Sequence, residues 1–102
     1  MTEYIQTVRS RALPGREAEY REWYLTTHLP AVLRIDGFVS GELLRLVAES
    51  DQPAEFLCVY RLETDDLATT QATTLAAGAL MSPSQAMDRS ATQVDVFERI
   101  AA

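Results

Sequence analysis

The chain has 102 residues and a mass of 11.4 kDa, a size that predicts a single domain over residues 1–102. Hydrophobic residues make up 47% and charged residues 24%, which is ordinary for a globular protein and argues against disorder. The net charge of −6 excludes the basic surface that a phosphate backbone requires, so nucleic acid is not an expected partner.

Residues that could bind metal or form disulfides are scarce. Cys58 is the only cysteine and His28 the only histidine, so we expect neither a disulfide within the chain nor a metal site, and we expect no cofactor. The first residues lack the apolar run of a signal peptide, and no window approaches the roughly 20 apolar residues that span a bilayer. We therefore expect a cytoplasmic protein without a membrane partner.

The N-terminal third predicts a strand followed by a helix. Residues 3–11 alternate as a strand does, and Leu13-Pro14-Gly15 ends the pattern. From Arg16 to Ile35 the period is helical, with an inward stripe that is rich in aromatic residues: Tyr20, Trp23, Tyr24, Thr27, His28, Ala31 and Ile35. Pro30 should kink this helix directly after His28, because proline lacks the N–H of a helical hydrogen bond.

Two further strands are predicted in the middle of the chain. Residues 38–49 form the first, residues 50–53 a turn, and residues 55–63 the second. The run at 55–63 is almost continuously apolar, as in a strand that is covered on both faces.

The last third predicts a helix and a strand. Residues 64–66 provide an N-cap for a helix over 66–80, followed by a connector over 81–90 and a strand over 91–100. The expected inward positions of this helix carry little bulk: Leu67, Gln71, Thr74, Leu75 and Gly78. Because empty space in a small core is costly, a cavity beneath this helix would indicate a ligand.

The resulting order is β-α-β-β-α-β. It predicts an α+β, ferredoxin-like fold: a four-stranded antiparallel sheet with both helices on one face. The other sheet face then has no cover within one chain, so we expect a homodimer that is joined through the sheet faces.

The segment Trp23-Tyr24-Leu25-Thr26-Thr27-His28-Leu29-Pro30, followed by Asp36-Gly37-Phe38, resembles the EthD-like branch of the dimeric α+β barrel superfamily. Shared features are an aromatic-rich first helix, His-x-Pro, and then glycine and an aromatic residue at the start of the second strand. The resemblance implies a dimeric α+β barrel. Relatives include polyketide cyclases, dehydratases, cofactor-free monooxygenases, isomerases and haem-degrading enzymes.

His28 is the candidate acid/base, because only imidazole has an unperturbed pKa near neutrality. Tyr60 is the candidate for polarising a substrate carbonyl. Five further side chains are expected to bind the substrate through an apolar pocket: Trp23, Tyr24, Tyr4, Leu75 and Phe97. The alternative for all of them is a structural role, with His28 bonded to a backbone carbonyl and the aromatic rings simply forming the core.

These residues and the resemblance favour a small cofactor-independent enzyme. It would act on an oxygenated aromatic or polyketide-like molecule by proton transfer, as a cyclase, dehydratase or isomerase does. Two alternatives stay open: a cofactor-free monooxygenase, for which Trp23 is the suggestive residue, and a non-catalytic module that binds a small ligand or mediates assembly. Haem degradation fits poorly, because the second helix has no histidine and the chain has no asparagine.

Overall fold

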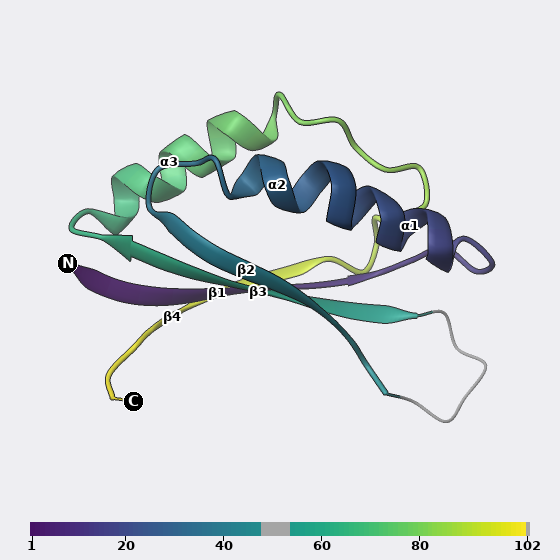
Figure 1. Cartoon of the computed structure of the whole chain (residues 1–102), viewed down its shortest axis with the longest axis horizontal. Coiled ribbons are helices and arrows are strands. Elements are labelled where there is room, and N and C mark those ends of the chain that lie inside the picture. Colours follow the sequence, from purple (N-terminus) through teal and green to yellow (C-terminus); the bar gives the residue numbers. More distant parts are fainter. Residues whose placement is uncertain (48–53, 102) are drawn as a thin grey trace.

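A sheet of four antiparallel strands carries all the helices on one face (Figure 1). The structure is a computed structural model that describes residues 1–47 and 54–101. The strands are β1 (Thr2–Arg11), β2 (Phe38–Arg45), β3 (Glu55–Thr64) and β4 (Gln93–Glu98), in the sheet order β2-β3-β1-β4. The helical segments are α1 (Glu17–Trp23), η1 (Tyr24–His28), α2 (Leu29–Val32) and α3 (Leu67–Gly78). This is the predicted ferredoxin-like β-α-β-β-α-β fold.

The strand boundaries follow the predictions, except that the two outer strands, β2 and β4, are shorter than predicted. β2 ends at Arg45, although the backbone N–H of Leu46 still donates to the Glu55 carbonyl at 2.8 Å. The predicted residues 48–49 of this strand, and the turn at 50–53, lie outside the described residues. β4 covers Gln93–Glu98 of the predicted 91–100. Within the described residues, no helix combines the length and apolarity needed to cross a bilayer.

The central strand β3 separates two faces of different character. Phe56, Cys58, Tyr60 and Leu62 are buried beneath the helices, and the alternate side chains project to the opposite face. On that opposite face Leu57 and Val59 are half-buried and Arg61 is exposed. The second face of β3 therefore has no cover within one chain, as expected, since all the described helices lie on the same side.

The first helical region contains an irregular turn that includes His28. α1 passes into the π-helical turn η1, after which the N–H of Leu29 bonds to the Tyr24 carbonyl, five residues back. The helix continues through Pro30 and ends at Val32, before the predicted Ile35. The irregularity therefore precedes Pro30 and does not follow His28 as predicted. Such π-turns often occur at functional positions.

α3 meets the sheet through a stripe that agrees with the predicted one only at Leu67 and Thr74. Asp66 caps it, accepting a hydrogen bond from the Thr69 N–H at 3.1 Å. Its inner residues are small or short: Leu67, Thr70, Thr74 and Ala77. The predicted Gln71, Leu75 and Gly78 are exposed, and Leu75 is 80% exposed. Thr70 packs closely against the residue that precedes β2, since a Cβ on Gly37 would lie 3.2 Å from Thr70 Cγ2.

Candidate functional site

A pocket of about 260 Å³ opens beside His28. Its walls come from β1, from α1 and η1, and from the connector that follows α3. The side chains and backbone that line it are Val8, Ser10, Tyr20, Trp23, Tyr24, His28, Gly78, Met81, Ser82, Pro83, Ser84, Met87 and Thr92. We call this space the His28 pocket.

Three rings form a continuous stack along one wall of the pocket. The Tyr20 and Trp23 rings lie 5.6 Å apart with an interplanar angle of 22°, and the Trp23 and His28 rings lie 4.7 Å apart at 16°. Tyr24 meets all three edge-on, at angles between 81° and 84°. Residues at spacings of three to five meet in this way because α1 and η1 bring them to the same helix face.

Hydrogen bonds at its outer members hold the stack in place. The buried Tyr20 hydroxyl donates to Ser10 Oγ on β1 at 2.7 Å. The indole Nε1–H of Trp23 donates to the Ser82 carbonyl of the connector at 3.1 Å. The stack on which the His28 ring lies is thus fixed to the sheet through Tyr20 and to the connector through Trp23.

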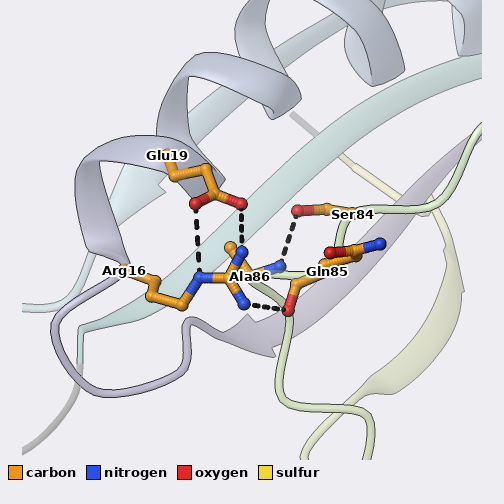
Figure 2. A network of polar contacts seen from close by, with 5 residues as sticks. All are labelled: Arg16, Glu19, Ser84, Gln85 and Ala86. Carbon is orange, nitrogen blue, oxygen red and sulfur yellow. Dashed lines mark hydrogen bonds and ion pairs between the residues drawn. The ribbon is translucent and has the colours of Figure 1, made fainter.

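The connector is fastened to the start of α1 by a second set of contacts (Figure 2). Arg16 binds Glu19 with two nitrogens, at 3.2 and 2.6 Å, and its Nη1 donates to the Gln85 carbonyl at 2.9 Å. The Ala86 N–H donates to Ser84 Oγ at 3.1 Å. These bonds keep the connector wall of the pocket against the helix without placing a charge inside the pocket.

His28 has the electrostatics of a neutral base. Burial lowers the pKa of its imidazole below the ordinary value of 6.5. Among the residues that the structure describes, no acid or carbonyl bonds to the ring, and its nitrogens are not among the fully buried unpartnered atoms. A nitrogen lone pair is therefore available to a molecule in the pocket at neutral pH.

Behind Tyr24, a small polar cluster is enclosed in the core. Tyr24 and Tyr60 are 2% and 1% exposed, and their buried hydroxyls lie beside each other and the Cys58 thiol without forming a hydrogen bond of standard geometry. Burial raises the pKa of both phenols well above 10.0 and also raises that of the neighbouring Cys58 thiol. All three groups are consequently neutral over the physiological range, and the Cys58 thiol is not activated as a nucleophile.

The predicted site residues separate into two groups. His28, Trp23 and Tyr24 line the same pocket. Tyr60 belongs to the core cluster and does not line the pocket, and Leu75 points away from it.

The remaining two predicted residues lie elsewhere on the sheet. Tyr4 faces the helices, opposite Leu62, four residues along β1 from Val8, or roughly 13 Å at strand spacing. Phe97 pairs with Ile5 on the face away from the helices, so it cannot share a wall with Trp23 in one chain. Phe97 is 55% exposed.

The connector contributes pocket residues that the sequence pattern did not identify. Met81, Ser82 and Met87 have no periodicity, because the segment after α3 is irregular. The signal available in the sequence was the pair of flexible, apolar methionines on either side of a Ser-Pro-Ser turn. In residues 1–47 and 54–101, no three His, Cys, Asp or Glu side chains gather in a way that could hold a metal ion.

Comparisons with known proteins identify the fold. No family model matches the chain, and no curated protein matches it. A haem-degrading protein from Mycobacterium tuberculosis, MhuD, solved with two haems in its active site, is 19% identical over 97% of both chains, with a TM-score of 0.68. An EthD family protein from Bacillus halodurans is 16% identical over 98% of this chain and 100% of its own, with a TM-score of 0.62.

A putative antibiotic biosynthesis monooxygenase from Bacillus cereus is 14% identical over 100% of this chain and 97% of its own, with a TM-score of 0.65. These similarities confirm the expected fold and include the EthD-like branch that the sequence resembles. At such identities they establish the fold alone, because one fold supports many activities.

Proposed function

We propose that this protein is a small cofactor-independent enzyme that transfers a proton next to a carbonyl group of an oxygenated aromatic or polyketide-like molecule. The observation that carries the proposal is the half-buried, neutral imidazole of His28, without a bonded partner among the described residues, on the wall of an aromatic pocket of about 260 Å³. His28 acts as the general base.

The step balances without any further reagent. A carbon–hydrogen bond next to the carbonyl breaks, its proton passes to an imidazole nitrogen of His28, and the electron pair moves onto the carbonyl oxygen as an enolate. The imidazolium then returns the proton at another atom, which gives isomerisation, or protonates a leaving hydroxyl, which gives dehydration. Alternatively, the enolate carbon attacks a second carbonyl of the same molecule, and the imidazolium gives its proton to the alkoxide that forms, which completes a cyclisation.

The pocket supplies two aids to this step. Tyr20, Trp23 and Tyr24 offer flat apolar surface to a conjugated ring. Ser10, Ser82 and Thr92 also line the pocket, and their hydroxyls are the candidate donors to the enolate oxygen. The Thr92 hydroxyl would exchange its 3.9 Å contact with Met87 Sδ for that bond. Tyr60, which we expected to polarise the carbonyl, is enclosed in the core, so the proposal rests on His28 and these hydroxyls.

The residues of α3 and the size of the pocket argue against haem as the ligand of this site. α3 contains no histidine, cysteine, methionine or tyrosine between Leu67 and Gly78 that could serve as an axial ligand. The pocket of about 260 Å³ lies below the roughly 300–1,000 Å³ of sites that hold drug-sized ligands. We therefore derive no step that uses haem.

Two other functions have specific support. The name of the Bacillus cereus neighbour, with Trp23 in the pocket wall, favours a cofactor-free monooxygenase, which would consume oxygen when it turns over an aromatic substrate. A binding module would hold the same molecules in the pocket without chemistry. Oxygen uptake and proton exchange distinguish the three functions.

We also propose that the active form is a homodimer joined through the sheet faces. The face away from the helices presents Ile5, Leu57 and Val59 at its centre, with Leu44 and Phe97 on the flanking strands at 44% and 55% exposure. Charged residues, among them Arg9, Arg61 and Asp95, surround this apolar centre. A stable interface of this kind buries about 1,600 Å² or more in total. Light scattering at micromolar concentration should give twice the chain mass, and a Phe97→Glu variant should shift it toward the monomer. A monomeric wild-type protein would contradict the proposal.

The proton transfer is tested by hydrogen–deuterium exchange, which needs no knowledge of the natural substrate. We expect the protein to accelerate loss of the acidic α-protons of 2-tetralone in D₂O, followed by proton NMR. His28→Gln should reduce the acceleration by about 10²–10⁴-fold, the usual contribution of a general base. Thr27→Gln makes a similar change at an exposed neighbour and should retain the rate. Unchanged exchange in His28→Gln would overturn the proposal.

A further inference from the structure

The His28 pocket contains no permanently charged side chain. Its lining consists of aromatic residues, methionines, hydroxyl residues, valine, glycine, proline and His28, without aspartate, glutamate, lysine or arginine. Arg16 and Glu19, which hold the connector at Gln85 (Figure 2), are not among the residues that line the pocket. The pocket is therefore polar only through hydroxyls, backbone groups and one imidazole.

An anion entering this pocket would lose hydration without gaining a counter-charge. Burying a carboxylate without a partner costs several kcal/mol, on the order of the binding energy of a small ligand. His28 does not compensate, because burial lowers its pKa and leaves it neutral at pH 7. The net charge of −6 on the chain adds a long-range repulsion.

We infer that the His28 pocket selects ligands without a carboxylate, so that its substrate is an uncharged aromatic ketone, phenol or enol that acquires charge only after it gives a proton to His28. This selectivity rests on the proposed function, because it describes the same site. It separates the substrate from aromatic acids of the same size and shape. With an uncharged substrate, the negative charge of the enolate or phenolate forms only beside the new His28 imidazolium, which stabilises it.

The single tryptophan gives a direct assay, because Trp23 lines the pocket and the chain has no other. Two probes of matched size are 2-naphthol and 2-naphthoate, which differ in charge at pH 7.5. We expect 2-naphthol to quench the fluorescence with saturation, and 2-naphthoate to bind at least about tenfold more weakly, a difference of about 1.4 kcal/mol. Equal or tighter binding of 2-naphthoate would overturn the inference.

A matched pair of variants tests whether the selectivity belongs to the pocket. Thr92→Lys adds a cation to the pocket wall and should tighten the binding of 2-naphthoate relative to that of 2-naphthol by about tenfold or more. Thr27→Lys adds the same charge at an exposed site outside the pocket lining and should change neither affinity. If Thr92→Lys has no effect, or Thr27→Lys has an equal one, the inference is wrong.

The two proposals fail in different ways. If neither probe quenches Trp23, the ligand site itself is wrong, and both proposals fall. If both probes bind equally while His28→Gln still abolishes tetralone exchange, the proton-transfer function stands and only the charge selectivity is wrong.

Discussion

The imidazole of His28 lies parallel to the indole of Trp23, with ring centroids 4.7 Å apart and planes inclined by 16°. Many catalytic histidines are oriented by a hydrogen bond from one ring nitrogen to a carboxylate. Among the described residues no such partner is present, and stacking takes its place. The indole is fixed by the Ser82 carbonyl and by Tyr20, so stacking on it sets the plane of the imidazole at the pocket wall.

Removing the indole should therefore impair exchange without removing the base. Trp23→Leu loses both the stack and the bond to Ser82, and we expect the tetralone exchange rate at saturation to fall by up to about 10²-fold, as for a misplaced catalytic group. Trp23→Phe retains an aromatic platform and should lose less. Steady-state kinetics of the two variants would measure kcat and KM separately. A Trp23→Leu enzyme with wild-type kcat would show that the stack does not position His28.

The burial of His28 predicts a loss of stability in acid. Because its pKa is lower in the folded protein than the unfolded value near 6.5, both states are neutral above 6.5 and this group does not alter stability there. As the pH falls below 6.5 toward the folded pKa, the unfolded chain binds the proton more readily, and the free energy of unfolding decreases. Urea unfolding between pH 7.5 and 5 should show a smaller decrease in His28→Gln. An identical pH dependence in the two proteins would contradict the claim that burial lowers the pKa of His28 in the folded protein.

The unpartnered hydroxyl of Tyr60 should be dispensable for stability. A buried donor without a partner costs about 1–3 kcal/mol, so we expect Tyr60→Phe to leave the free energy of unfolding unchanged or to raise it by about 1 kcal/mol. Tyr20→Phe is the matched control, because it removes a hydroxyl that is bonded to Ser10 and should lower stability by about 1 kcal/mol. Both are measured by urea denaturation. Strong destabilisation by Tyr60→Phe would indicate a partner for this hydroxyl.

Gly41 makes room for the ring of Tyr60 beside β2. A Cβ at this position would lie 2.8 Å from Tyr60 Cδ1 and 2.9 Å from Leu29 Cδ1. Gly41→Ala should lower the free energy of unfolding by about 1–3 kcal/mol through overpacking. Gly78→Ala, where no atom lies within 4 Å, should be neutral or stabilising by up to about 1 kcal/mol. Thermal melting of the two variants checks the contrast, which equal melting temperatures would contradict.

The order of elements was predictable because each strand and helix has its own periodicity or cap. β3, with its apolar run from Phe56 to Leu62, and α3, with its cap at Asp66, illustrate this. The stripe of α3 was less predictable. Its residues are small and weakly apolar throughout, so the contrast between apolar and polar positions does not indicate which face of the helix points inward.

The site was predictable only where one helix supplies it. Trp23, Tyr24 and His28 share a stripe that can be recognised from spacing, and all three line the pocket. Met81 and Met87 come from an irregular connector, whose position depends on long-range bonds such as that from Trp23 to Ser82. Phe97 was assigned to the wrong face, because the alternation along β4 does not by itself reveal which side the helices cover.

The pH dependence of tetralone exchange tests the central claim most directly, because the chain has a single histidine whose pKa can be measured independently by NMR. If His28 is the base, the exchange rate should be constant at neutral pH and should fall by about tenfold for each pH unit below the His28 pKa. The midpoint of the kinetic profile should then equal the NMR pKa, which lies below 6.5. A rate that does not follow the ionisation of His28, or that persists in His28→Gln, would contradict the account.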